Sequence, residues 1–307
     1  MKIIVTGGAG FIASHVVDAY IKAGHRVVVI DDRSKGFSKN INPKAKFYKA
    51  DITDLAAMEK IFKKEKPEVV NHHAAIAEVV RSMRDPIPTL TVNVLGTANL
   101  LLAFGHHGRG AHRKFIFAST GGAMYGDPKR VPVNETAPVG PLSPYGLSKL
   151  LAEEAIVFYA KQFGFDYFIF RYANVFGPRQ NPRGEAGIVA IFGALMKSGA
   201  APTIFGDGRK SRDYIYVGDV ALANLAALRR GENTIVNLGN GTLVTDREVF
   251  KTIAREVGFD GAPVYAPYRA GEIYRISLNA AKARKILGWK PKMAFEKGVR
   301  EAVKGIK

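Results

Sequence analysis

The chain has 307 residues, contains no cysteine and is 47% hydrophobic. This length allows one large core or two unequal domains, and the lack of cysteine excludes disulfides, thiolate nucleophiles and cysteine-ligated metals. No apolar run reaches the ~20 residues of a membrane span, and the first residues lack the apolar stretch of a secretory signal. We therefore expect a cytoplasmic protein that does not interact with a membrane.

The charge is strongly basic, because 45 Lys and Arg residues outnumber 27 Asp and Glu residues and give a formal net charge of +18. A surplus of this size can indicate a nucleic-acid partner. The basic residues are scattered along the chain, however, with no basic arm and no recognition-helix motif. We expect no nucleic-acid partner, and a surface that favours small anionic substrates.

Short apolar runs rich in β-branched residues alternate with segments typical of helices. The runs predict strands at 2–6, 26–31, 46–50, 68–72, 114–118 and 166–172, and the segments between them predict helices at 11–23, 55–63, 88–104 and 144–163. Continuous rather than alternating apolarity is typical of parallel strands covered on both faces. The pattern predicts an α/β protein with a doubly wound parallel sheet of the Rossmann type.

The alternation loosens after residue 174. A helix at 188–198, a helix at 218–229 and a strand at 234–238 are still expected, and the remainder is mostly helical with loops. We expect residues 1–173 plus 213–240 to form the sheet domain. Residues 174–212 plus 241–307 are expected to form a smaller, mostly helical substrate domain from interleaved segments, with a cleft between the two.

The first strand runs directly into the glycine-rich stretch TGGAGFIAS, residues 6–14. Glycines there permit a tight turn and a close approach of the backbone to a pyrophosphate at the helix N-terminus, and the small Ala13 lets the helix pack on the strand. A glycine cluster alone also fits an ordinary turn. This one follows a strand and opens a helix, which is the context of a dinucleotide-binding turn.

An acidic residue, Asp31, ends the second strand. In that place a carboxylate can accept both ribose hydroxyls of an adenosine and would repel the extra phosphate of NADP. NAD is therefore favoured, although Arg33 and Lys35 lie close in the sequence.

Tyr145 and Lys149 lie four residues apart near the start of a predicted helix. Ser143 is suited to the N-cap and Pro144 to the first helical position, so both side chains fall on one face. Such a pair often only decorates a solvated helix. In a domain that also binds a dinucleotide, the ammonium and the positive nicotinamide would favour the phenolate and make Tyr145 a general base. Ser119 or Thr120, at the end of the fifth strand, can hold the same substrate hydroxyl.

Nine stretches together resemble the extended short-chain dehydrogenase/reductase family, and most closely its NAD-dependent UDP-glucose (UDP-galactose) 4-epimerases. They cover essentially the whole chain: VTGGAGFIASH, VIDDRSKG, ADITD, NVLGTANLL, STGGAMYGD, PLSPYGLSK, RYANVFGPRQ, IFGDGRKSRDYIYVGDVA and RAGEIYRISLN. The resemblance implies that Tyr145 is the catalytic base, that Lys149 binds the nicotinamide ribose and lowers the tyrosine pKa, and that Thr120 or Ser119 hydrogen-bonds the sugar.

The resemblance also implies a set of binding residues. The implied cofactor-lining residues are Gly7, Gly10, Phe11, Ile12, Asp31, Asp32, Gly36, Asp51, Ile52, Ala74, Ala75, Asn93, Tyr145, Lys149 and Tyr172. On the substrate side, Asn174 is expected to contact the diphosphate, Phe205 the uracil and Glu272 the uridine ribose. Arg212 and Arg269 are expected to clamp the phosphates, since a guanidinium donates two hydrogen bonds to phosphate oxygens.

Several sugar-nucleotide reactions share this scaffold, so the fold alone does not choose among them. Related dehydratases carry an acid pair directly after the threonine, where this chain has Gly121 and Gly122. We therefore expect reversible 4-epimerisation of UDP-glucose and UDP-galactose through a 4-keto sugar on tightly bound NAD. UDP-N-acetylhexosamine or UDP-glucuronate epimerisation, another dehydratase or reductase, and a non-catalytic NAD-binding protein remain alternatives.

Two further expectations concern assembly and metals. The resemblance implies a homodimer formed through helices 88–104 and 144–163. Adjacent histidines at 72–73 and 106–107 could indicate a metal site. Neighbouring residues on a strand point to opposite faces and no carboxylate cluster accompanies them, so no metal is expected.

Overall fold

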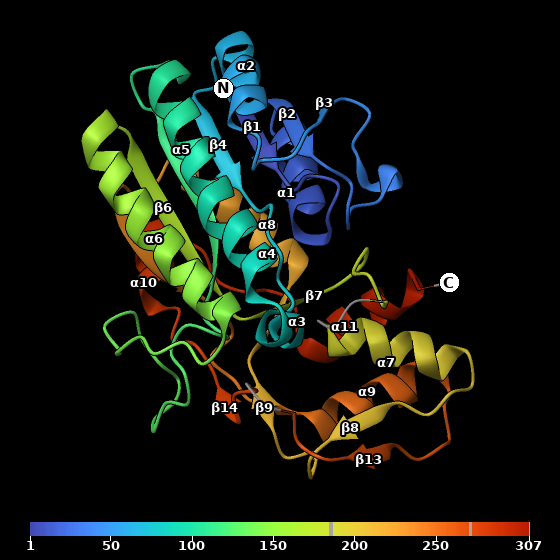
Figure 1. Cartoon of the computed structure of the whole chain (residues 1–307). Helices are drawn as coiled ribbons and strands as arrows, with labels where there is room; N and C mark the ends of the chain where they lie inside the picture. The colour runs from blue at the N-terminus through green and yellow to red at the C-terminus, as the bar shows by residue number, and fades with distance from the viewer. Residues whose placement is uncertain (184–186, 270–271, 307) are drawn as a thin grey trace.

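The computed structural model describes residues 1–183, 187–269 and 272–306. Residues 184–186, in the loop expected after residue 174, and residues 270–271 of the RAGEIYRISLN stretch lie outside the described residues. A seven-stranded parallel sheet forms the larger part of the molecule (Figure 1). Its order is β11-β6-β5-β4-β1-β2-β3, and its strands are β1 (Lys2–Thr6), β2 (Arg26–Asp31), β3 (Lys46–Lys49), β4 (Val69–His72), β5 (Lys114–Thr120), β6 (Asp166–Tyr172) and β11 (Thr234–Leu238).

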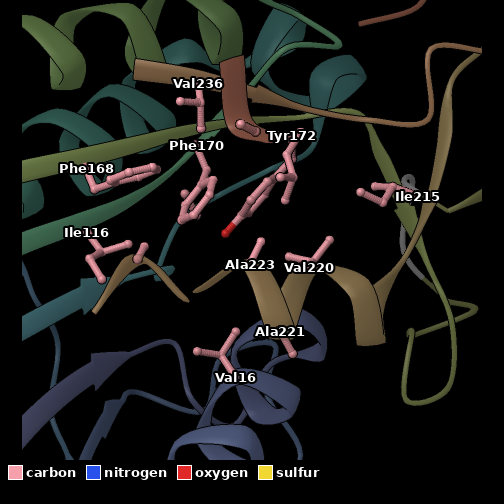
Figure 2. Close-up of a cluster of buried hydrophobic side chains, with 14 of the residues drawn as sticks. Val16, Ile116, Phe168, Phe170, Tyr172, Ile215, Val220, Ala221, Ala223 and Val236 are labelled. Atoms are coloured by element: carbon pink, nitrogen blue, oxygen red, sulfur yellow. The ribbon is translucent and has the colours of Figure 1, made fainter. Parts of the chain in front are cut away.

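Helices cover both faces of this sheet, as its continuous apolar strands require. One face carries α1 (Phe11–Lys22) and α8 (Val217–Ala227), and the other carries α2 (Leu55–Glu65), α5 (Gly96–His107) and α6 (Pro144–Phe163). In the core between the sheet and the layer of α1 and α8, Phe168, Phe170 and Tyr172 of β6 face Val220 and Ala223 of α8 (Figure 2). The fold class expected from the sequence is confirmed.

The sheet order reverses between β1 and β4, the two strands that lie side by side at its centre. In open parallel sheets, the crevice at the carboxyl ends of such strands is where ligands bind. The loops after β1, β2, β4 and β5 converge on this edge, and they carry most of the site residues expected from the sequence.

The helix expected at 88–104 begins earlier and is longer. Its successive parts are α4 (Pro86–Leu90), the π-helical segment η2 (Thr91–Leu95) and α5 (Gly96–His107), and a short helix α3 (Val79–Arg84) precedes it. The 22 residues from Pro86 to His107 are long and apolar enough to cross a membrane by length and composition, contrary to the sequence expectation. Half of the most apolar 18-residue stretch of this segment is buried inside the fold. The segment packs against α2 and α6, as a core helix does.

The second part of the molecule lies beyond one end of the sheet (Figure 1). It contains α7 (Ile188–Lys197), α9 (Asp246–Val257) and α11 (Phe295–Lys304) around a separate apolar core. Short strands complete it or join it to the sheet domain: β7 (Asn174–Phe176), β8 (Thr203–Phe205), β9 (Ser211–Arg212), β10 (Tyr214–Tyr216), β12 (Val244–Thr245), β13 (Val264–Ala266) and β14 (Arg275–Ile276).

One segment departs from the expected domain boundary. The helix α10 (Ala281–Leu287) and Trp289 belong by sequence to the second domain, but they pack on the core beside α8. The indole nitrogen of Trp289 donates to the carbonyl of Asp219 at 2.9 Å. The chain therefore returns to the sheet domain once more before it ends in α11, because the amphipathic α10 finds its apolar partner there.

Candidate active site

The turn after β1 has the shape of a dinucleotide cradle. Gly7 has a φ of +71°, and a Cβ on it would lie 2.8 Å from the backbone nitrogen of Ala74, so only glycine fits. The amide of Gly10 donates to the carbonyl of Gly7 at 2.9 Å, and Gly10 is the N-cap of α1. The backbone is thereby open toward a ligand at the positive end of the helix, where a pyrophosphate binds favourably.

Asp31 is fixed at the edge of this turn. Its carboxylate accepts from the amides of Ala9 at 3.0 Å and Arg33 at 2.7 Å, which leaves lone pairs on both oxygens for ribose hydroxyls. Burial raises the pKa of Asp31, and the two amide bonds oppose that shift. Of the two nearby cations, Lys35 is paired with Glu78 at 3.1 Å. The residues present fit NAD at this position.

A single cavity of about 930 Å³ joins the two halves of the expected site. Its lining includes the following expected residues: Gly7, Gly10, Phe11, Ile12, Asp31, Asp32, Gly36, Asp51, Ile52, Ala74, Ala75, Ser119, Thr120, Tyr145, Lys149, Tyr172, Asn174, Phe205, Arg212, Arg269 and Glu272. Segments far apart in the chain thus meet around one space.

Tyr145 and Lys149 lie at the start of α6 as expected. The Ser143 hydroxyl caps the helix by accepting from the amide of Gly146 at 3.1 Å, and Pro144 occupies the first turn. Burial raises the pKa of Tyr145 to about 12, against a hydrogen bond with Thr120 that lowers it. Burial also lowers the pKa of Lys149 to about 7, and the charge of Glu153 opposes that shift. The protein residues alone therefore leave Tyr145 a neutral phenol near pH 7, and a phenolate needs further positive charge in the cavity.

The structure separates the roles of Ser119 and Thr120, which the sequence left open. The Ser119 hydroxyl donates to the carboxylate of Glu153 at 2.5 Å. Thr120 hydrogen-bonds the Tyr145 side chain. The reason is the alternation of side chains along β5, which sends successive residues to opposite faces. Thr120 is the residue that can share a substrate hydroxyl with Tyr145.

Asn93 departs from the expected cofactor-lining set. It is not among the described residues that line the cavity. Its side chain accepts from the amide of Ile76 at 2.8 Å, and donates to the carbonyl of Ile76 and to the hydroxyl of Ser148, each at 2.9 Å. Asn93 thus fixes the cavity wall to α6 rather than touching the cavity itself.

His72 and His73 do lie on opposite faces of the sheet. His72 contacts the hydroxyls of Thr6 at 2.7 Å and Thr97 at 2.9 Å, whereas His73 stacks on Tyr172. Burial lowers the pKa of His72 well below its usual value and that of His73 to about 3. Both rings are neutral at physiological pH. His73 also lines the cavity.

Charged side chains gather in the substrate half of the cavity. The guanidinium of Arg269 covers the ring of Phe205 at 4.1 Å and forms an ion pair with Glu272. Arg212 donates to the carbonyls of Ser211 at 3.0 Å and Tyr274 at 3.1 Å. Phe205 and Arg269, which were expected to contact the uracil and a phosphate, therefore lie in direct contact.

Lys210 also belongs to this cluster, although it was not among the residues expected from the sequence. It is 5% exposed and forms ion pairs with Glu272 and, at 3.8 Å, with Asp246. Burial would raise the pKa of Glu272, but its pairs with Lys210 and Arg269 lower it. The only signal in the sequence is a lysine within the glycine-rich stretch FGDGRKSRD.

The space beside Thr120 is closed to larger side chains. A Cβ on Gly121 would lie 2.4 Å from Leu278, and one on Gly122 would lie 3.2 Å from the Asn174 amide oxygen. No carboxylate is available at these two positions for an elimination. The groups around the reacting position are therefore a phenol, a hydroxyl and an ammonium, which suit removal and return of a hydroxyl proton.

A Rossmann-type sheet with a dinucleotide turn and a tyrosine–lysine pair at one cavity defines a nucleotide-dependent enzyme of the dehydrogenase/reductase class. The model of the NAD dependent epimerase/dehydratase family matches residues 3–239. The chain belongs to this family, which confirms the resemblance and the expected cofactor.

Curated and solved relatives match over the full length. The chain is 47% identical to a putative UDP-glucose 4-epimerase of Methanocaldococcus jannaschii, covering 99% of this chain and 98% of that protein. It is similar to the UDP-glucose 4-epimerase of Thermotoga maritima solved with UDP-glucose, with 45% identity, a TM-score of 0.96 and coverage of 99% and 98%. It is also similar to the Thermus thermophilus enzyme solved with NAD, with 40% identity, a TM-score of 0.94 and the same coverage.

Proposed function

We propose that this protein is an isomerase that interconverts UDP-glucose and UDP-galactose at carbon 4, with NAD held in the turn after β1. The observation that carries this proposal is one cavity that is lined by Tyr145, Lys149 and Thr120. The turn after β1, together with Phe205 and Arg269, lines the same cavity. A nucleotide sugar that lies along this cavity places its hexose beside Tyr145.

Each central residue has a defined part in the proposed reaction. NAD supplies reversible hydride transfer at carbon 4 when it is bound. Tyr145 takes the proton of the 4-hydroxyl and later returns it, while Thr120 orients that hydroxyl. Lys149, which donates to the carbonyl of Ala118 at 2.8 Å, holds positive charge beside the phenol. A 4-keto sugar that turns over between the two transfers would present its opposite face to the same residues.

The charged cluster is proposed to hold the diphosphate through this turning. Arg269 and Lys210 share the carboxylate of Glu272 in the structure. A diphosphate carries more negative charge than one carboxylate and can accept from both cations at once. We expect Glu272 to release Arg269 as substrate binds and to accept from the uridine ribose instead, with Asn174 and Arg212 near the phosphates.

The proposal is tested by incubating the purified protein with UDP-galactose, without added cofactor, and measuring UDP-glucose by chromatography. Wild type should convert the sugar, and Tyr145→Phe should lose ~10³-fold in rate, within the range of a lost general base. No conversion by wild type, even with added NAD, would sink this substrate. UDP-N-acetylhexosamine and UDP-glucuronate would be tested next.

The division of labour between the two parts of the molecule is also proposed. Residues 1–173 plus 213–240 would hold NAD, and residues 174–212 plus 241–307 would hold the nucleotide sugar, with α10 and Trp289 assigned to the sheet domain on their packing. We further propose that the protein acts in the cytoplasm.

A homodimer through α4–α5 and α6 is supported by large apolar side chains that these helices leave exposed. Ile87 and Leu95 are 65% and 50% exposed on the first, and Leu151 and Phe158 are 41% and 64% exposed on the second. The two helices pack against one another, so the four residues can contribute to one surface. Sedimentation should give a dimer for wild type and a monomer for Phe158→Glu.

A further inference from the structure

A buried charged cluster is built around Glu153, on the same helix as Tyr145 and Lys149. The Glu153 carboxylate accepts from the Ser119 hydroxyl at 2.5 Å and from Arg171 through Nε at 3.0 Å and Nη2 at 2.6 Å. Glu153 is 1% exposed and Arg171 is 5% exposed. A charge pair buried this deeply is costly to desolvate and is a weak source of stability. Its position beside the site therefore indicates a functional role.

Arg171 is itself locked from its other side. Its Nη1 donates to the hydroxyl of Tyr125 at 3.0 Å, and that hydroxyl donates to the side-chain oxygen of Asn237 at 2.7 Å. Figure 2 shows Phe170 and Tyr172 on one face of β6, and alternation puts Arg171 on the other, toward α6. Three strand ends and α6 therefore hold the Glu153 carboxylate in a single orientation.

Lys149 lies one turn before Glu153 on α6. The two residues are four apart, on one side of the helix, and Lys149 is 3% exposed. The Lys149 ammonium donates to the carbonyl of Ala118 at 2.8 Å and lies 4.6 Å from the centre of the Phe117 ring. Burial disfavours its charge, and Glu153 is the cause that favours it.

Other titratable groups near Lys149 do not replace this carboxylate. They are Tyr145 on α6, His72 at the end of β4, His73 directly after β4, and Arg171 and Tyr172 on β6. Burial keeps both histidines neutral and raises the pKa of Tyr172. The guanidinium of Arg171 is satisfied by Glu153 and Tyr125. Glu153 is thus the negative charge at hand for Lys149.

We propose that Glu153, oriented by Arg171, is a positioning residue that keeps the proton shared by Lys149 and Tyr145 on the lysine. With one proton between them, the pair is either ammonium with phenolate or amine with phenol. A carboxylate one turn beyond Lys149, and two turns from Tyr145, favours the first state. This inference rests on the proposed function, in which Tyr145 is the base.

The test follows Tyr145 ionisation in the NAD-loaded protein by its near-ultraviolet phenolate absorbance, with Tyr145→Phe subtracted as the blank. In Glu153→Gln the lysine should lose its proton first, so that the phenolate midpoint rises by ~1 pH unit or more. A residue that only repelled the phenolate would give the opposite sign, and a purely structural residue would leave the midpoint unchanged. Either result would overturn the proposal.

Three further variants make the outcome specific. Glu153→Asp keeps the carboxylate and should restore the wild-type midpoint. Glu154→Gln removes the neighbouring exposed carboxylate on the same helix and should leave the midpoint unchanged. If Glu153→Gln fails to fold because Arg171 is left unpaired, the double variant Glu153→Gln/Arg171→Gln carries no unpaired charge and should show the same upward direction. A midpoint equal to wild type in that double variant would overturn the proposal.

The phenolate measurement distinguishes an error in the role of Glu153 from an error in the proposed function. If wild type shows no Tyr145 phenolate below the range of an ordinary tyrosine, Tyr145 is not an activated base and the proposed function itself is in error. If wild type shows it and Glu153→Gln shows the same midpoint, only the role of Glu153 is lost.

Discussion

The two halves of the cavity are built by different means. The NAD half uses backbone and short side chains at consecutive strand ends of one sheet, such as Gly7 after β1 and Asp31 at the end of β2. The substrate half uses long charged side chains from segments far apart in the chain, such as Lys210, Arg269 and Glu272. The packing of the sheet holds the residues of the NAD half in place. The charged side chains of the substrate half are held instead by ion pairs with one another.

This difference predicts different behaviour on binding. Backbone groups held by a buried sheet are already placed for a ligand and need little rearrangement. Cations that share an internal carboxylate must exchange it for phosphate oxygens, so the substrate half should adjust when the sugar nucleotide enters. A change to the NAD half should therefore abolish binding, and a change to the substrate half should weaken it by degrees.

The largest effect is expected from Gly7→Ala. A Cβ at this position would meet the backbone of Ala74 at 2.8 Å, and Gly7 has a φ of +71°. Gly7 follows β1 and Ala74 follows β4, and neither strand can move without disturbing the core. Strain and overpacking of this kind together correspond to ~10²-fold weaker NAD binding. The NAD content of the purified variant, measured after acid release, should fall well below that of wild type.

A matched control is Gly24→Ala, because that glycine also has a positive φ but a Cβ on it has open space around it. This variant should keep its NAD. Full NAD content in Gly7→Ala would show that the turn is not the rigid element described here.

Arg269→Ala should have an intermediate effect confined to the substrate half. Loss of one charge-assisted contact to a phosphate corresponds to a ~10-fold to 100-fold rise in KM with little change in kcat. Steady-state kinetics with UDP-galactose measures both constants. Arg209→Ala removes a cation from the loop between β8 and β9 whose side chain is 73% exposed, and its KM should equal that of wild type. Equal KM values for both variants would contradict the phosphate role of Arg269.

The smallest effect is expected where the two halves meet, from Ser119→Ala. This change removes a buried hydrogen bond to Glu153 and should lower the free energy of unfolding by ~1 kcal/mol while Tyr145 keeps its partner. Thr120→Val should lower kcat ~10-fold or more. It should also lower the free energy of unfolding, because the Thr120 hydroxyl accepts from the buried amide of Ala123 at 3.2 Å. Denaturant unfolding and kinetics on the two variants would separate these effects. A lower kcat in Ser119→Ala but not in Thr120→Val would return the sugar contact to Ser119.

Local signals in the sequence predicted most of the sheet domain and its site. Ser143, Pro144 and Gly164 mark the ends of α6, and Gly164 has the left-handed φ that ends helices. The dinucleotide turn and Asp31 were predictable because each depends on residues next to one strand end. The direction of Ser119 was also predictable in principle, since it follows from alternation beyond the buried Phe115 and Phe117.

The remainder depends on contacts between residues far apart in the chain. The pairing of Lys210 with Glu272 joins two residues that are 62 positions apart in the sequence, and no periodicity predicts it. The position of Asn93 outside the cavity lining depends on its hydrogen bond to Ser148, which lies on another helix. The return of α10 and Trp289 to the sheet domain depends on an apolar surface that only the folded sheet creates.

The most direct test of the proposed reaction is the fate of the hydrogen on carbon 4. UDP-galactose carrying deuterium at that carbon, incubated with the NAD-loaded protein in ordinary water, should give UDP-glucose that keeps the deuterium at carbon 4. Such retention would show that the same hydrogen leaves and returns within one cavity while Tyr145 handles only the hydroxyl proton. Loss of the deuterium to water during conversion would contradict a transient 4-keto sugar held between Tyr145 and NAD.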